Sequence, residues 1–243
     1  MAPEFITKYV SCKDLHYYVS GQVKFGTLEH YRADERLLTE QRRNAIEMRL
    51  GDDLDEGKEK QIFSVPDGKR VGKISAPGIV LHGGNFKSVN IVNHIEINDW
   101  VFCASIGAYD RTHHRKMKEV NPDRQLTSYV VFDFAKLLRA LDIYFRERYF
   151  VLQHAGKVPY LIASKVHYQE REIRADISQF GDVDLTASSQ EDYERAVFSK
   201  PVGFKHEKEF RIVAGLNRPN FAPRGAQPVF PKSELIRKSM IPN

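Results

Sequence analysis

Two glutamates and an arginine alternate along one short segment, in a pattern that could support acid–base chemistry. Residues 204–213 read Phe-Lys-His-Glu-Lys-Glu-Phe-Arg-Ile-Val. In a β-strand, whose side chains alternate with period two, Glu207, Glu209 and Arg211 point to one face. Neighbouring carboxylates repel each other, and this repulsion raises the pKa of one of them. A solvated strand face with cross-strand ion pairs explains the same pattern equally well.

Two other segments place polar side chains on apolar, strand-like runs. Lys8 and Tyr9 belong to the run at 5–10, and Ser105 lies near the end of the run at 100–106. Residues 100–104 are all apolar, which predicts a strand in the middle of a sheet. The polar groups that could act with the glutamates are therefore expected on strands far apart in the sequence.

The remaining chain mixes helical and strand-like patterns without a βαβ rhythm or an internal repeat. Asp133 precedes the strongest amphipathic helix pattern, and Asp67-Gly68 is a hairpin turn signal. The glycine-rich residues 83–85 are expected to separate two strands. We expect helices at 12–19, 27–50, 134–149 and 190–198, and strands at 5–10, 22–26, 61–65, 69–75, 79–81, 87–97, 100–106, 128–132, 160–168, 204–213 and 227–230. These elements predict an α+β fold in a single domain over residues 1–243.

The chain is mildly basic, with 37 basic and 32 acidic side chains and a formal net charge of +5. This balance permits a polyanionic partner but does not require one. Basic residues gather at 111–118, inside a polar stretch at 109–124 that we expect to be a loop. In such a loop His113 and His114 could grip a phosphate backbone, although a solvated loop is the more common outcome.

The cysteine and histidine spacing argues against a metal site. Cys12 and Cys103 are the only cysteines, and we expect both to be reduced. No zinc-binding spacing is present, so no metal is expected. The sequence also lacks an apolar signal core and any run that could span a bilayer, which predicts a cytoplasmic protein without a membrane partner.

The order of these segments resembles the mono-ADP-ribosyltransferase fold. That fold holds NAD in the cleft of a split, largely antiparallel β-sheet, with Arg or His on the first strand, Ser or Tyr on a middle strand and Glu on a late strand. The chain also resembles an uncharacterised bacterial family found among phage-defence and mobile-element genes. The matching pieces are Lys8-Tyr9, residues 25–32, Gly51-Asp52, Glu56-Gly57, residues 101–105, residues 198–200 and residues 207–211.

The resemblance assigns catalytic roles to the two glutamates. Cleavage of the nicotinamide–ribose bond builds positive charge on the ribose, and a nearby carboxylate stabilises that charge. By resemblance, Glu209 is this carboxylate. Glu207, two residues earlier, would orient or deprotonate the acceptor nucleophile.

The resemblance also assigns NAD-binding roles. Lys8 would hold the diphosphate, and Ser105 would bond near the nicotinamide ribose or brace Glu209. Tyr9 or Tyr109 would stack on the nicotinamide ring. Arg211, next to the glutamates on the same strand face, is counted with the cofactor-binding residues.

The resemblance thus predicts an NAD-dependent ADP-ribosyltransferase that modifies a macromolecule, as a bacterial toxin or anti-phage effector. The basic charge favours a nucleic acid, RNA or DNA, over a protein as acceptor, and a toxin of this kind implies an antitoxin partner. Lys8 and Cys103-Ala104 depart from the usual residues, so a non-catalytic nucleic-acid- or nucleotide-binding module stays open. A third hypothesis is a nuclease with Glu207, Glu209 and Asp52 around Mg²⁺.

Overall fold

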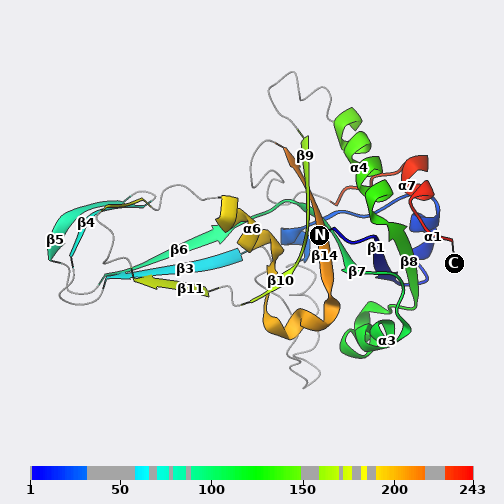
Figure 1. Cartoon of the computed structure of the whole chain (residues 1–243), viewed down its shortest axis with the longest axis horizontal. Coiled ribbons are helices and arrows are strands. Elements are labelled where there is room, and N and C mark those ends of the chain that lie inside the picture. Colours follow the sequence, from blue (N-terminus) through cyan, green and yellow to red (C-terminus); the bar gives the residue numbers. More distant parts are fainter. Residues whose placement is uncertain are drawn as a thin grey trace.

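A six-stranded antiparallel sheet forms the centre of the computed structural model (Figure 1). The strand order is β8-β1-β7-β14-β9, and the short strand β2 pairs with β7. Its strands are β1 (Phe5–Val10), β2 (Gly26–Thr27), β7 (Trp100–Ile106), β8 (Ser128–Asp133), β9 (Pro159–Lys165) and β14 (Glu209–Leu216). The apolar run at 100–106 is therefore a central strand, as predicted. The structure describes residues 2–31, 58–65, 70–76, 79–85, 89–148, 159–169, 172–176, 182–184, 190–216 and 228–242.

Three helices lie on one side of this sheet: α1 (Leu15–Val19), α4 (Phe134–Arg148) and α7 (Glu234–Lys238) (Figure 1). The predicted cap of α4 is confirmed, because the Lys136 amide donates to Asp133 Oδ1 at 3.0 Å. Leu137 and Leu141 on α4 are fully buried in the main core, with Phe102 from β7. The helices therefore bury one face of the central sheet, and polar side chains are left to gather away from this core.

Three further strands extend from the sheet as an arm (Figure 1). They are β3 (Lys58–Val65), β6 (Val89–Glu96) and β11 (Glu172–Asp176), and β4 (Arg70–Ala76), β5 (Ile79–Asn85) and β12 (Asp182–Asp184) lie farther out. The hairpin predicted from Asp67-Gly68 is wrong, because β3 pairs with β6 and β4 pairs with β5. The turn itself lies outside the described residues. Residues 83–85 belong to β5 and do not separate strands.

Helix α6 (Gln190–Phe198) connects the arm to the sheet, and its bounds agree with the prediction. Its Tyr193 and Val197 are buried together with Ile95 at the end of β6 and Val101 of β7. Asp99, which directly precedes β7, is fully buried and accepts hydrogen bonds from the Tyr193 hydroxyl at 2.9 Å and from Tyr160 at 3.0 Å. The arm base and the sheet therefore share a packed junction.

The predicted basic loop is a helix, α3 (Arg111–Val120), followed by a 3-10 turn, η1 (Pro122–Arg124). The Asp110 side chain caps α3 by accepting from two backbone amides. His113 and His114 are buried on its inner face, so they do not belong to a solvated loop. The inner face of this helix carries histidines in place of aliphatic side chains, so apolar residues do not recur there at helical spacing and the pattern did not predict a helix.

Two expected strands and one expected helix differ from the structure. Of the strand expected at 22–26, only Gly26 lies in a strand, β2, while Gln22 and Phe25 form isolated bridges. In the segment expected as a strand at 227–230, Val229 forms only an isolated bridge, and Gln227 lies outside the described residues. Of the helix expected at 27–50, residues 28–31 are helical, Thr27 belongs to β2, and residues 32–50 lie outside the described residues. The fold is α+β with mostly antiparallel sheets; β10 (His167–Tyr168) and β13 (Ser199–Lys200) form one of the parallel pairs. Among the described residues, no helix has the length and apolar character needed to cross a membrane.

Candidate functional site

Strands β1, β7 and β14 bring three distant parts of the chain into one row. Thr7 is the cross-strand partner of Ser105, and Ser105 is the partner of Glu209. Adjacent strands in a sheet lie about 4.8 Å apart, so these positions are close neighbours. The strands that carry Lys8, Ser105 and Glu209 are therefore consecutive in the sheet.

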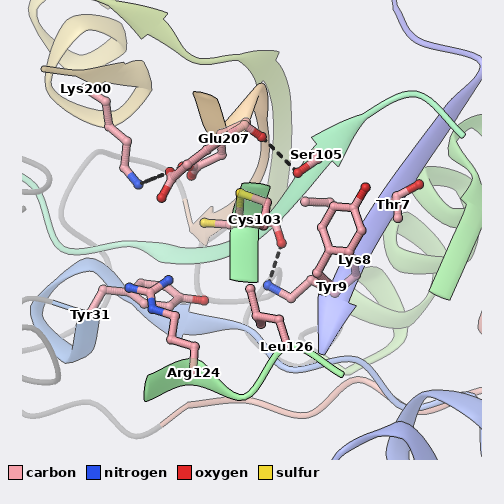
Figure 2. Close-up of a pocket in the computed structure, with 13 residues that line it drawn as sticks. Thr7, Lys8, Tyr9, Tyr31, Cys103, Ser105, Arg124, Leu126, Lys200 and Glu207 are labelled. Atoms are coloured by element: carbon pink, nitrogen blue, oxygen red, sulfur yellow. Dashed lines mark hydrogen bonds and ion pairs between the residues drawn. The ribbon is translucent and has the colours of Figure 1, made fainter. Parts of the chain in front are cut away.

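A cavity of about 110 Å³ opens at this row (Figure 2). Five residues singled out from the sequence line it: Lys8, Tyr9, Ser105, Glu207 and Glu209. The other lining residues are Thr7, Tyr31, Cys103, Ala104, Met117, Arg124, Leu126 and Lys200. A cavity of about 150 Å³ encloses a benzene ring, so this smaller cavity, which is open to solvent, would hold a ring-sized group only in part.

Glu207 reaches the cavity from a turn and not from a strand. Residues 202–207 form a 3-10 helix, η2 (Val202–Glu207), and Lys208 adopts a left-handed conformation with φ of 48°. The strand predicted at 204–213 is therefore wrong before Glu209, where β14 begins. The left-handed residue reverses the chain direction, and both glutamates still face the cavity.

Ser105 fixes the turn that carries Glu207. Its hydroxyl donates to the Glu207 backbone carbonyl at 2.9 Å, as Figure 2 shows. His113 Nε2 lies 3.3 Å from the same hydroxyl. Ser105 thus braces the main chain of Glu207, and among the described residues its hydroxyl makes no hydrogen bond to the Glu209 carboxylate.

Two cations hold the two buried carboxylates. Lys200 Nζ lies 2.8 Å from Glu207 Oε2 and 2.8 Å from Glu209 Oε2. Arg211 Nε donates to Glu209 Oε1 at 2.6 Å, and another guanidinium N–H donates to the Val197 carbonyl. Arg211 is 0% exposed and does not line the cavity, so it supports Glu209 from behind and does not reach a ligand. Burial of such charges is tolerated only because each is paired.

The surroundings separate the pKa values of the two carboxyl groups. Burial raises the pKa of Glu207 to about 7, although Lys200 partly opposes this shift. Burial also acts to raise the pKa of Glu209, but Arg211 and Lys200 outweigh it and hold that pKa well below its usual range. A hydrogen bond between the two carboxyl groups adds to both shifts. Near neutral pH, Glu209 is ionised while Glu207 exchanges a proton, which is the division that acid–base chemistry requires.

Lys8 lies on the other side of the cavity (Figure 2). Its ammonium donates to the Cys103 carbonyl at 2.6 Å and lies 5.4 Å from the centroid of the Phe102 ring. Burial lowers the pKa of Lys8, while Cys103 and Glu209 partly raise it again. An ammonium has three N–H donors and this bond uses one, so Lys8 can bind an anion in the cavity.

The two tyrosines proposed for ring stacking differ in position. Tyr9 lines the cavity, and its ring stacks on His114 with centroids 4.8 Å apart. Tyr109 does not line the cavity; it stacks on Tyr129 with centroids 3.7 Å apart. The structure therefore brings Tyr9, but not Tyr109, to the site.

Tyr31, Arg124 and Lys200 are among the cavity residues that had no role assigned from the sequence. Tyr31 belongs to residues 25–32, one of the pieces matched by resemblance. Gly26 makes room for it, because a Cβ there would lie 2.9 Å from the Tyr31 ring. Lys200 lies in one of the pieces matched by resemblance, yet its contacts with both glutamates come only from tertiary structure.

The geometry does not favour a divalent cation at the glutamates. The Lys200 ammonium already occupies the bridging position between Glu207 and Glu209. In the described part of the chain, no group of three or more potential metal ligands occurs. Asp52, the third ligand of the nuclease hypothesis, lies outside the described residues.

Comparisons with protein-family models, with curated proteins and with solved structures give no match to this chain. Its function must therefore be inferred from the geometry of the cavity.

Proposed function

We propose that this chain is an NAD-dependent ADP-ribosyltransferase with an ADP-ribosyltransferase-like fold, and that it acts as a bacterial toxin or anti-phage effector. One observation carries the proposal: Lys8, Ser105 and Glu209 come from three consecutive strands and meet at one cavity. The same three residue positions were selected from the sequence by resemblance to that fold. An antitoxin that restrains the enzyme is part of this proposal.

The cavity is compatible with one end of NAD. The cavity of about 110 Å³ opens to solvent, so a nicotinamide ring would lie partly inside it, where it would contact the Tyr9 ring. Lys8 and Arg124 line the same cavity and supply positive charge for the diphosphate. The rest of the dinucleotide would lie across the mouth of the cavity.

The chemistry follows from the division of charge between the glutamates. The nicotinamide leaves with the electron pair of the C–N bond, and positive charge develops on the ribose. Glu209 is ionised and stabilises that charge. Glu207, with a pKa of about 7, accepts the proton that the acceptor nucleophile loses when it bonds to the ribose carbon.

The test is transfer from labelled NAD to separate pools of RNA, DNA and protein. We expect label in a nucleic-acid pool, and we expect Glu209→Gln to lower transfer by at least about 10³-fold, because charge stabilisation of this kind supplies a large part of catalysis. The variant removes the carboxylate that Arg211 and Lys200 share, although Lys200 keeps its ion pair with Glu207, so its unfolding must be measured by circular dichroism.

Asp99→Asn is the matched control, because it also converts a buried carboxylate to an amide but does not touch the cavity. We expect it to keep transfer within a few-fold of the wild type. Full transfer by a folded Glu209→Gln variant would remove Glu209 from the mechanism. If the wild type binds NAD without cleaving it, the non-catalytic module is the better description.

A further inference from the structure

A basic surface lies beside the cavity, on the exposed faces of α3 and η2 and on the residue after η2. We call it the α3–η2 surface. Its exposed cations are Arg111, Arg115, Lys116, Lys118, Lys205 and Lys208. Two exposed acids accompany them: Asp110 caps α3, and Glu119 lies 3.9 Å from Arg115. The surface is therefore strongly positive over two adjoining elements.

The cations of the two elements form one continuous surface, because α3 packs directly against η2. Burial lowers the pKa of His206 on η2, and the positive charges of Lys116 and Lys200 lower it further. Burial and then Lys208 lower the pKa of His113 on α3. Each element thus places a lysine close to a histidine of the other, and at neutral pH the charge of the surface comes from lysine and arginine.

The α3–η2 surface continues into the cavity. Met117 on the inner face of α3 and Glu207 at the end of η2 both line it. Arg124, in the turn that follows α3, lines the cavity and is also exposed to solvent. A polyanion bound across this surface would therefore pass the cavity mouth.

We propose that the α3–η2 surface binds the phosphate backbone of single-stranded RNA, and that this RNA is the acceptor of the transfer. The second part rests on the proposed function; the first does not. Because the nicotinamide ring of the proposed function takes up the cavity of about 110 Å³, the acceptor must bring its nucleophile to the cavity mouth beside Glu207, which a nucleotide outside a base-paired stack can do. Single-stranded loops and ends of RNA present unstacked bases readily, whereas bases in duplex DNA are enclosed by stacking.

Binding of a fluorescent, mixed-sequence 20-nucleotide RNA, measured without NAD by anisotropy across a salt series, tests the surface. The variant is Arg111→Gln with Lys116→Gln and Lys205→Gln. Because each phosphate contact contributes about 0.7 to the slope of log K against log salt for single strands, three lost contacts should lower the slope by about 2 and the affinity at 0.1 M salt by roughly 100-fold.

The control is Lys136→Gln with Arg139→Gln and Arg146→Gln, three exposed cations on α4, which lies away from α3 in Figure 1. It removes the same charge and should bind RNA within a few-fold of the wild type. Equal losses in both variants, or no loss in the α3–η2 variant, would overturn the proposal. Tighter binding of duplex DNA than of the RNA would also overturn it.

The two proposals can fail separately. A wild-type protein that binds RNA through this surface but never cleaves NAD supports the surface and refutes the transferase. Label on the protein pool, together with weak and salt-insensitive RNA binding, refutes the surface and keeps the transferase.

Discussion

Two buried carboxylate clusters lie at opposite ends of the paired strands β7 and β14, and different partners stabilise them. Asp99, before the first residue of β7, accepts hydrogen bonds from two tyrosine hydroxyls, which are neutral. Glu209, the first residue of β14, contacts two cations and a second carboxyl group. Both positions are at most 6% exposed, so burial does not distinguish them.

The two clusters differ in whether one of their groups can gain or lose a proton near neutral pH. Burial, followed by Asp99, raises the pKa of both Tyr160 and Tyr193, so their hydroxyls keep their protons at physiological pH. In the other cluster, the pKa of Glu207 is about 7 and the group lines a cavity. One cluster is therefore a fixed structural junction, and the other can exchange a proton with a ligand.

Lys200→Met should give the largest loss of stability, because it removes the cation shared by both glutamates. Breaking a buried ion pair on one side costs about 3 kcal/mol or more. The loss should be largest near pH 8, where both carboxylates are charged, and smaller near pH 5, where Glu207 is protonated. Urea unfolding at both pH values measures it, and Lys200→Arg, which keeps the charge, is the control. An equal loss at both pH values would contradict the ionic account.

Asp99→Asn should cost less, about 2 kcal/mol, because both hydroxyls donate to Oδ2 and an amide oxygen in that position still accepts them, as weaker bonds to a neutral group. The loss should be the same at pH 6 and pH 8, since the tyrosine hydroxyls do not titrate there. Urea unfolding under the conditions used for Lys200→Met gives a direct comparison. A pH-dependent loss would show that the two clusters are not of different kinds.

Glu207→Gln should change the free energy of unfolding least at low pH, and its effect should grow as the pH rises. The folded pKa of about 7 lies above the unfolded value, so wild-type stability from this group falls as pH rises from about 4.5 to 7, by at most about 1.4 kcal/mol per pH unit. A glutamine does not ionise, so the stability of the variant should rise relative to that of the wild type as the pH increases across this window.

His113 and His206 titrate in the opposite sense, because a lowered histidine pKa adds stability as pH rises. The difference between variant and wild type cancels their contribution. Thermal unfolding at half-unit steps from pH 5 to 8 measures this difference. A constant difference across the range would mean that Glu207 does not titrate there.

Local patterns predicted the elements that depend on local interactions. The helices at 134–149 and 190–198 and the strand at 100–106 follow from their apolar periods and, for the first, from the cap at Asp133. The pairing of β3 with β6 and of β4 with β5 was not predictable from the turn signal between β3 and β4. Strand partners are chosen by long-range packing, which a turn signal does not report.

The candidate site was predictable only in part, because some of its contacts depend on long-range packing. Lys8, Tyr9, Ser105, Glu207 and Glu209 carry the resemblance, and all line one cavity. Lys200 acts through contacts with residues seven and nine positions later, across a 3-10 turn and a left-handed residue. The sequence 204–208 alternates as a strand would, so nothing in its pattern indicates that turn.

The different supports of the two glutamates have a consequence for protein engineering. Glu209 is anchored by pairing with Ser105 on β7 and by the Val166 amide, which donates to the Glu209 carbonyl, whereas Glu207 lies on a short turn held by the Ser105 hydroxyl. Insertions or exchanges within residues 202–206 can therefore move one acid relative to the other without rebuilding the sheet. The spacing of the two acids can therefore be adjusted through this turn, and under the proposed function an exchange of the turn alone would change which acceptor is used.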